Sequence, residues 1–218
     1  MRTLAIGDIH GCATSLRALW NLVQPTEHDH IIFLGDYVDR GPDTKGVIDF
    51  LLEKKDAYNI TFLSGNHEEK MFLARYNADE LAQWIDVWDA TATLDSYNAK
   101  TLEEIPATHW AFLENCKPYH ETDTHIFVHA NLDPQVPLTE QQPFVLIHKK
   151  FDHPAPHLSG KTMICGHTAQ KNHRPLDIGH AICIDTDSGR NGWLTCLHIE
   201  TGDYWQSNEA GESRSPII

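Results

Sequence analysis

The feature that most constrains the fold of this chain is the alternation of two kinds of segment over its first 77 residues. Short apolar runs are predicted to be buried strands, and the segments that follow them place apolar side chains at helical spacing. The strands are expected at 3–7, 31–34 and 60–63, and the helices at 13–24, 44–54 and 67–77. This order of strand and helix predicts an α/β fold with a parallel component.

The rest of the chain continues without an internal repeat or a linker longer than a loop. Residues 79–117 are predicted to be helical, with Pro118 closing the segment, and Thr201–Gly202 is expected to turn a hairpin. Further strands are expected at 125–129, 162–165, 181–185, 193–199 and 203–206. Residues 207–218 are expected to be frayed. We therefore expect a single domain that spans residues 1–218.

The charge balance excludes several classes of partner. The chain has 17 Lys and Arg against 31 Asp and Glu, which gives a formal net charge of −14. Such a chain repels the nucleic-acid backbone and anionic lipid, so neither nucleic acid nor membrane is expected as a partner. A protein of this charge that handles an anion needs a local source of positive charge, and bound metal ions supply it most directly.

The location of the protein is expected to be cytoplasmic. No apolar run approaches the roughly 18 residues of a membrane helix, and the apolar stretch that ends at Ile6 is too short for a signal peptide. The five cysteines include no CxxC pair, and we expect all of them to be reduced.

Five predicted strands are each followed closely by a residue that can bind a metal. The residues are Asp8, Asp36, Asn66, His129 and His167, and His10 lies two positions after Asp8. In open α/β sheets, functional groups gather beyond the carboxyl ends of the strands, so these side chains are expected to meet in one crevice. A mixed set of oxygen and nitrogen donors suits Mn²⁺, Fe or Zn²⁺. Six donors suit two ions about 4 Å apart with one bridging carboxylate.

Three strings of residues carry a resemblance to a known family. They are GDIHG at 7–11, GDYVDRG at 35–41 and GNHEE at 65–69, and VHAN, CGHT and ICIDT follow at 128–131, 165–168 and 182–186. The sequence resembles the metallophosphoesterases, and within them the PPP-type phosphoprotein phosphatases of the short bacterial and phage kind and their diadenosine-tetraphosphate hydrolase relatives. The resemblance implies a four-layer α/β/β/α sandwich of two mixed sheets flanked by helices.

The resemblance also assigns the metal ligands. It implies that Asp8 and His10 bind a first metal and that Asp36 bridges two metals. The ligands that it implies for the second metal are Asn66, His129 and His167. Two divalent ions follow as cofactors, with Mn²⁺ the first expectation and Fe or Zn²⁺ the alternatives.

Three further residues are assigned catalytic roles by the same resemblance. His67 is expected to be the general acid that protonates the leaving oxygen, Asp39 its orienting partner, and Arg40 the clamp on a phosphate oxygen. The nucleophile in this family is a hydroxide that bridges the two metals.

Each assignment has a structural alternative. Asp8 and Asp36 could be turn residues, Asp39 and Arg40 a surface ion pair, and His67 a helix-start residue. The joint occurrence of the three strings favours the site over these alternatives. Glu68 and Glu69 are given no role, and the remaining ten histidines are interpreted as surface or satisfied core groups. The Trp84 and Trp88 pair, at i, i+4 spacing, is interpreted as core or cap packing.

The sequence departs from the family pattern at two places where many PPP phosphatases carry an arginine. Ser64 precedes the GNHEE string, and His148 lies between the last two histidine ligands. Lys149 and Lys150 are neighbours but lack the planar fork of arginine. Substrate recognition is therefore expected to be altered, with Arg40 and His148 as the predicted substrate-binding residues.

The function predicted from the sequence is metal-dependent hydrolysis of phosphate monoesters by a Ser/Thr-type phosphoprotein phosphatase. The alternative is a dinucleoside polyphosphate hydrolase of the diadenosine tetraphosphate type, or a broad phosphomono- and diesterase. A third interpretation is an inactive metal-binding scaffold. The expected partners are a phosphorylated protein, a small phosphate ester or a nucleotide, and the oligomeric state is left open.

Overall fold

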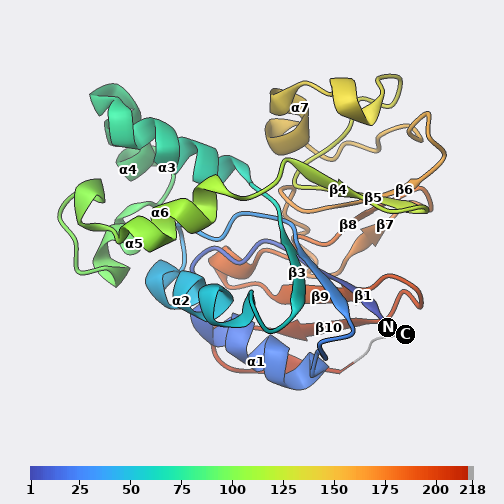
Figure 1. Cartoon of the computed structure of the whole chain (residues 1–218), viewed down its shortest axis with the longest axis horizontal. Helices are drawn as coiled ribbons and strands as arrows, with labels where there is room; N and C mark the ends of the chain where they lie inside the picture. The colour runs from blue at the N-terminus through green and yellow to red at the C-terminus, as the bar shows by residue number, and fades with distance from the viewer. Residues whose placement is uncertain (216–218) are drawn as a thin grey trace.

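The computed structural model describes residues 1–215, and in this range the strands form two mixed sheets (Figure 1). The first sheet has the strand order β11-β10-β9-β1-β2-β3. Its members are β1 (Thr3–Ile6), β2 (His30–Phe33), β3 (Asn59–Phe62), β9 (Leu194–His198), β10 (Tyr204–Ser207) and β11 (Ser213–Arg214). Strands β1, β2 and β3 run parallel, whereas β9, β10 and β11 each pair antiparallel with their neighbours.

The second sheet has the order β4-β5-β6-β8-β7. It is built from β4 (Tyr119–Glu121), β5 (His125–Val128), β6 (Thr162–Cys165), β7 (Leu176–Asp177) and β8 (Ala181–Cys183). Strands β5, β6 and β8 are parallel, and the two edge strands are antiparallel. Each sheet therefore has a parallel centre, and the carboxyl ends of its parallel strands present their following residues along one edge.

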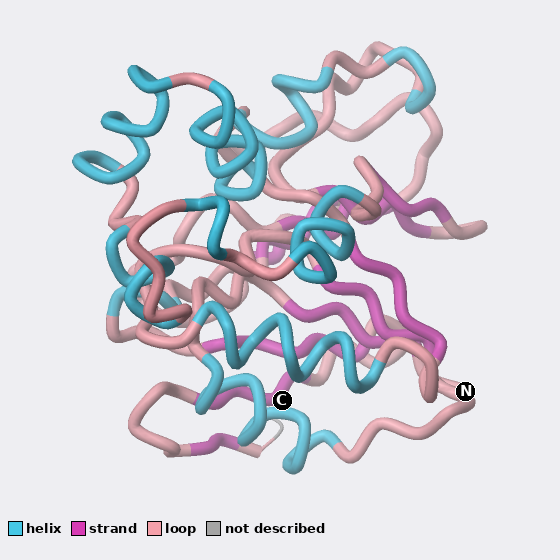
Figure 2. Tube along the Cα trace, turned by 60° about the vertical axis from the view of Figure 1, so that its left-hand side comes forward, coloured by secondary structure: helices cyan, strands magenta, loops and turns pink. Residues whose placement is uncertain are grey.

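The helices lie outside the two sheets, as Figures 1 and 2 show from two directions. Helices α1 (Ala13–Val23) and α2 (Thr44–Lys54) connect the first three strands. A helical segment joins the two sheets and contains α3 (Asn66–Tyr76), α4 (Ala78–Val87), α5 (Thr91–Ser96), η1 (Leu102–Glu104) and α6 (Ala107–Glu114). Later in the chain come η2 (Leu138–Glu140), α7 (Pro143–His148) and η3 (Ser188–Arg190).

Three apolar clusters separate the layers. One lies between the sheets and includes Ala5, Ile32, Phe127 and Ile164. The alternate residues of the same strands point the other way, because successive side chains of a strand face opposite sides. On β1 and β2, these outward-facing side chains pack against the helices near α1. On β5 and β6, they pack against the α7 region. The expected four-layer α/β/β/α arrangement is thereby confirmed.

The predicted elements agree with the structure in most places. Helix α2 has the expected bounds, and the hairpin at Thr201–Gly202 is confirmed by the antiparallel pairing of β9 and β10. The short elements β4, β7, β11 and α7 were not expected, because they have too few residues to show a periodicity. The segment that is predicted to be helical, 79–117, contains most of α4 together with α5, η1 and α6.

The prediction that residues 207–218 are frayed is wrong for 207–215, and 216–218 lie outside the described residues. Ser207 ends β10, and β11 pairs with β10. The carboxylate of Glu209 accepts hydrogen bonds from the backbone N–H of Thr14 and Ser15 in the first turn of α1, at 3.3 and 2.9 Å. An acid at a helix N-terminus satisfies free N–H groups there, so this long-range contact fixes the segment.

The cysteines and the lengths of the helices can also be compared with what the sequence predicts for residues 1–215. The five cysteines are free in the described structure, as expected. Among residues 1–215, every helix is too short or too polar to cross a bilayer. The interpretation of the chain as a single domain stays a prediction.

Asp29 is the buried acid that ties the start of the chain to the loop before β2. Its carboxylate is 2.7 Å from the Arg2 guanidinium and accepts hydrogen bonds from the N–H and hydroxyl of Thr26. Burial opposes ionisation, but the hydrogen bonds from Arg2 and Thr26 outweigh it and hold the pKa of Asp29 well below its usual range. The carboxylate therefore contributes stability only while it is ionised.

We predict that Asp29→Asn lowers the free energy of unfolding by about 1–3 kcal/mol at pH 7, because a hydrogen-bonded buried charge is lost. The folded pKa lies below the unfolded value of about 3.9, so this contribution is complete above roughly pH 5 and declines as the pH falls below about 4. Urea unfolding of wild type and Asp29→Asn at pH 7 and pH 3 measures this contribution to the free energy of unfolding. Asp56→Asn, at an exposed acid, is the control. A difference between Asp29→Asn and wild type that does not shrink at pH 3 would contradict the prediction.

Candidate active site

The six predicted metal ligands lie together at the carboxyl ends of the parallel strands. Asp8 follows β1, Asp36 follows β2, Asn66 begins the helix after β3, and His129 and His167 follow β5 and β6. The side-chain oxygen Oδ1 of Asn66 is 2.9 Å from His129 Nε2 and 2.8 Å from His167 Nδ1. Residues from both sheets therefore meet at one place, as the sequence predicts.

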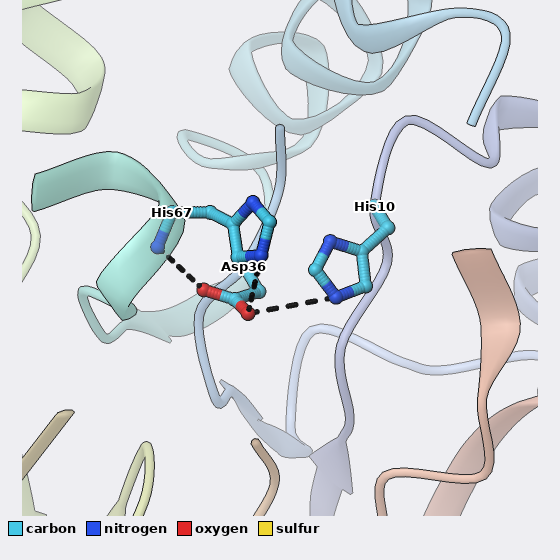
Figure 3. Close-up of side chains that lie close together, drawn as sticks. All are labelled: His10, Asp36 and His67. Atoms are coloured by element: carbon cyan, nitrogen blue, oxygen red, sulfur yellow. Dashed lines mark hydrogen bonds and ion pairs between the residues drawn. The ribbon is translucent and has the colours of Figure 1, made fainter. Parts of the chain in front are cut away.

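Asp36 is the residue that two potential metal-binding groups share. The first group is His10, Asp36 and His67, and the second is Asp36, His129 and His167. In each group the candidate ligand atoms lie within 4.8 Å of one another. Figure 3 shows the first group, with the rings of His10 and His67 facing the Asp36 carboxylate.

Each oxygen of the Asp36 carboxylate faces one of these groups. Oδ2 is 3.5 Å from His10 Nε2, whereas Oδ1 is 3.4 Å from His129 Nε2. Oδ1 also accepts a hydrogen bond of 3.1 Å from the backbone N–H of His67, at the start of α3. A carboxylate with one oxygen toward each group has the geometry required of a bridge between two cations.

Asp8 stands slightly apart from the first group. Its Oδ2 is 4.0 Å from His10 Nε2, and both of its oxygens accept from the backbone N–H of His167, at 3.0 and 3.2 Å. The first group thus contains His67 in the place where the sequence predicts Asp8. The assignment of Asp8 as a metal ligand stays a prediction.

The backbone around the ligands adopts an unusual conformation. His10, Asp36 and His167 all have a positive φ, at 49°, 51° and 63°. Non-glycine residues in the left-handed region are uncommon and gather at functional sites, where the surrounding structure holds them. At Gly65 a side chain would collide with the carboxylate of Asp36. This glycine therefore lets the chain pass directly beside the shared carboxylate.

The electrostatics of the cluster favour a bound cation. Burial and the neighbouring carboxylates of Asp185 and Asp36 raise the pKa of Asp8 well above its usual value, and burial raises the pKa of Asp185 to about 6. Three buried carboxylates at one place repel one another unless positive charge lies between them.

The imidazoles beside these carboxylates are in the form that binds metals. Burial lowers the pKa of His10 and His129, and burial together with His129 lowers the pKa of His167 to about 4. A neutral imidazole has a free lone pair on one nitrogen. His10 and His129 donate their Nδ1 protons to the backbone oxygens of Val38 and Leu34, which leaves Nε2 as the lone-pair nitrogen. The donor set fits two divalent cations.

His67 and Asp39 form a direct pair beside the shared carboxylate. His67 Nδ1 donates to Asp39 Oδ2 over 2.7 Å, and both residues are almost completely buried. Burial alone lowers the pKa of His67, but the carboxylates of Asp36 and Asp39 outweigh it and raise the pKa above its usual value. His67 Nε2 is buried without a hydrogen-bond partner in the described structure and lies 4.0 Å from Asp36 Oδ2. The pair therefore points an unused ring nitrogen at the cluster.

Arg40 follows Asp39 and reaches the same cluster. Its Nη1 donates to His10 Nε2 over 2.6 Å, and its Nε is buried without a partner among the described residues. One lone pair cannot serve both this donor and a cation, so a metal at His10 Nε2 requires the Arg40 guanidinium to move away. Arg40 also lines a cavity of about 280 Å³ with Gly189 and Asn191 in its wall.

The two positions where the sequence departs from the family pattern lie close to the cluster. The ring nitrogen Nε2 of His148 is 2.6 Å from Glu69, and its ring stacks on Phe144. The backbone oxygen of His148 accepts from His167 Nε2 at 3.1 Å, so His148 supports a predicted ligand through its main chain. Its side chain is engaged by Glu69 and not by Arg40. Ser64 lines a separate cavity of about 200 Å³ under α7.

Glu68 is a buried residue whose importance sequence reasoning missed. Its carboxylate accepts hydrogen bonds from the backbone N–H groups of Asp36, Tyr37 and Gly65, at 2.9, 2.8 and 2.8 Å. Burial raises its pKa to about 7, with a further contribution from the charge of Asp36. An acid three residues after Gly65 is a visible capping signal, but its reach into the Asp36 loop is not visible in the sequence. The sequence likewise indicates no role for Asp185, in the ICIDT string.

Several of the remaining histidines are satisfied or exposed, as the sequence analysis expects. His109 lies between Tyr97 and Asp49, His157 is bonded to Val136, and His28 is exposed. Trp84 is fully buried, which confirms its predicted core position.

The chain is similar in sequence to two proteins whose names are those of phosphate-ester hydrolases. The symmetrical bis(5'-nucleosyl)-tetraphosphatase of Nitrosomonas europaea is 27% identical over 149 residues, which cover 65% of this chain and 49% of that protein. The chain thus spans about half the length of that relative. Serine/threonine-protein phosphatase 1 of Salmonella typhimurium is 26% identical over 207 residues, which cover 89% of this chain and 90% of that protein.

A similar solved structure supports the fold. A protein assigned provisionally as a diadenosine tetraphosphatase superposes with a TM-score of 0.69 at 21% identity, over 100% of this chain and 94% of the other. The model of the calcineurin-like phosphoesterase family matches residues 1–171, which include both potential metal-binding groups. The chain belongs to the calcineurin-like phosphoesterase family.

Proposed function

We propose that this protein hydrolyses phosphate monoesters, as a metal-dependent phosphatase of the Ser/Thr protein phosphatase type. The observation that carries the proposal is the His67–Asp39 pair, whose free ring nitrogen faces the Asp36 carboxylate that two metal-binding groups share. The Salmonella phosphatase, which aligns along nearly the whole chain, supports the same class of reaction. An inactive scaffold would not need this buried pair.

The residues divide into a metal-binding set and a proton-donating set. We assign the first cation to Asp8 and His10, and Asp36 to both cations. For the second cation we assign Asn66, His129 and His167. Two divalent cations held there would supply a hydroxide nucleophile at neutral pH and neutralise charge on the phosphate.

The remaining residues act on the leaving group and the phosphate. His67 presents Nε2, from which a proton can pass to the leaving oxygen, and Asp39 holds the opposite nitrogen of the ring. Arg40, once released from His10, offers two N–H groups to the phosphate oxygens. We propose Mn²⁺ as the metal, with Fe or Zn²⁺ as alternatives, because the donors are a mixture of carboxylate, amide and imidazole.

A second candidate function is hydrolysis of dinucleoside polyphosphates. The cavity of about 280 Å³ that Arg40 borders has a mixed lining of polar and apolar groups, which includes Asn191, Asn208, Glu209 and Pro42. This volume is near the lower limit of small-molecule sites and leaves room for a group beyond the scissile phosphate. The Nitrosomonas relative carries the name of such a hydrolase.

A substrate panel distinguishes the two candidates. The metal-loaded protein is assayed with a phosphoserine peptide, with diadenosine tetraphosphate and with p-nitrophenyl phosphate. We expect the highest kcat/KM among the first two for the phosphoserine peptide. A higher kcat/KM for diadenosine tetraphosphate would favour the second candidate, and no hydrolysis of any of the three would contradict both.

We predict that activity requires a divalent cation, because three buried carboxylates and three neutral imidazoles converge without enough positive charge from the protein. Chelation followed by dialysis is expected to abolish p-nitrophenyl phosphate hydrolysis, and Mn²⁺ is expected to restore it. The metal content is measured by elemental analysis in parallel. Full activity in protein that is verified to be free of metal would refute the requirement.

We predict that His67→Asn lowers kcat for the phosphoserine peptide by about 10²–10⁴-fold, because the alkoxide leaving group then lacks its proton donor. The loss is expected to be much smaller for p-nitrophenyl phosphate, whose leaving group is stable without a proton. Metal content is expected to be unchanged. His157→Asn removes another buried histidine far along the sequence and is the matched control. Equal losses for the two esters would show that His67 does not act on the leaving group.

A further inference from the structure

The carboxylate of Asp39 is held by three donors from three different helices. His67 in α3 donates its Nδ1 proton to Oδ2 over 2.7 Å, and Trp84 in α4 donates its indole N–H to the same oxygen over 2.9 Å. Thr93 in α5 donates its hydroxyl proton to the other oxygen, Oδ1, over 2.9 Å. All four side chains are buried, and those of Asp39, Trp84 and Thr93 are fully so.

This arrangement fixes the rotation of the carboxylate. A carboxylate with one partner can turn about its Cβ–Cγ bond and carry that partner with it. Here Thr93 holds one oxygen and Trp84 approaches the other, so a lone pair of Oδ2 is left pointing at the His67 ring. In a buried environment these hydrogen bonds are strong, because water does not compete for the carboxylate.

The segment that contains α4 and α5 also holds the backbone of the loop at residues 39–40. Asp39 and Arg40 are consecutive residues in the left-handed region, with φ of 69° and 68°. This conformation is unfavourable for two adjacent non-glycine residues and persists only where other contacts impose it. Thr93 Oγ1 accepts the backbone N–H of Asp39 at 2.9 Å, and the backbone oxygen of Asp89 accepts the N–H of Arg40 at 3.1 Å.

The ring of His67 is confined from two sides. The centroid of the His10 ring lies 4.6 Å from that of the His67 ring, and the centroid of the Trp88 ring lies 4.8 Å from it. Both pairs have edge-to-face geometry. Trp88 directly follows α4, so it belongs to the same segment as Trp84 and Thr93. Residues 84–93 therefore control both the partner of His67 and the space in which its ring can turn.

We propose that Trp84 and Thr93 are positioning residues of the general acid: they orient the Asp39 carboxylate so that His67 presents Nε2 to the leaving oxygen of the substrate. The inference rests on the proposed function, since it presumes that His67 is the proton donor. It gives the α4–α5 segment a role in catalysis in addition to packing. Neither residue touches the substrate in this proposal.

Another tryptophan in the same apolar cluster shows that a buried indole is tolerated without such a contact. Trp110 is 3% exposed, and its indole N–H has no hydrogen-bond partner in the described part of the chain. Trp110→Phe therefore removes a buried indole without removing a hydrogen bond, and it is a matched control for Trp84→Phe. Thr61, a buried threonine bonded to His30, gives the control Thr61→Val for Thr93→Val.

The test compares two leaving groups in the metal-loaded protein. We expect Thr93→Val and Trp84→Phe to lower kcat for a phosphoserine peptide by about 10–100-fold, the range typical of side chains that orient a metal-binding residue through a hydrogen bond. We expect a much smaller loss for p-nitrophenyl phosphate, with KM and metal content unchanged. Thr93→Ser, which keeps the hydroxyl, is expected to restore the wild-type kcat.

A second measurement does not depend on catalysis. In the metal-free protein, the Nδ1 proton of His67 is expected to give a downfield proton resonance, identified by its absence in His67→Asn. We expect this resonance to persist in Trp110→Phe and Thr61→Val and to be lost through faster exchange in Thr93→Val. An unchanged resonance in Thr93→Val would overturn the proposal, even in a variant with reduced thermal stability.

The outcomes separate this inference from the proposed function. His67→Asn can lose more activity on the peptide than on the nitrophenyl ester while Thr93→Val and Trp84→Phe show no such difference between the two esters. In that case the positioning role is wrong and the proposed function stands. If His67→Asn loses both activities equally, the general acid itself is wrongly assigned. Parallel losses on both esters in Thr93→Val, matching those of Thr61→Val, would show a purely structural role.

Discussion

The burial of Asp36 at the meeting point of two sheets is the constraint on which the rest of the site depends. Its carboxylate has one oxygen toward His10 and the other toward His129, so it joins side chains from both halves of the fold. Burial alone would raise its pKa, but positive charge on the surrounding imidazoles when they are protonated, led by that of His129, lowers it below its usual range. Where these imidazoles are neutral, bound cations would take over this compensation. Glu68 then holds the loop that carries it, through backbone N–H groups. A buried anion is tolerable only with such compensation.

The acidic character of the whole chain affects how the cluster can attract an anionic substrate. At a net charge of −14, the protein as a whole repels a phosphate dianion. Arg40 is the cation that contacts the ligand set in the described structure, through His10. Cations held by buried carboxylates and neutral imidazoles would therefore serve both to stabilise the site and to attract the substrate. The same donors could not do so if the imidazoles were protonated, because like charges would repel the metal.

The sequence predicts the position of the site better than its internal contacts. The sequence predicts that Asp8, Asp36 and His129 lie together, because a strand end fixes where the next residue lies and a strand can be recognised from local pattern alone. Of the partners of Asp39, only His67 is predicted, by the resemblance. Trp84 and Thr93 cannot be predicted, because they lie more than 40 residues further along the chain and the helices that carry them show only a packing pattern. The order of the segment after residue 207 is not visible in the sequence for the same reason, since only the fold brings Glu209 to α1.

The surroundings of His148 bear on the choice between the two candidate substrates. Its ring is engaged by the carboxylate of Glu69, so this side of the site presents an acid and a histidine in contact and not a free cation. A phosphate monoester carries two negative charges and gains most from guanidinium contacts, whereas an internal phosphate of a polyphosphate carries one. Ser64 carries no charge, so Arg40 and bound cations would have to provide nearly all of the attraction for a dianion. In the proposed function, Arg40 would help to bind a dianion only after its guanidinium has left His10, to which its Nη1 donates in this structure.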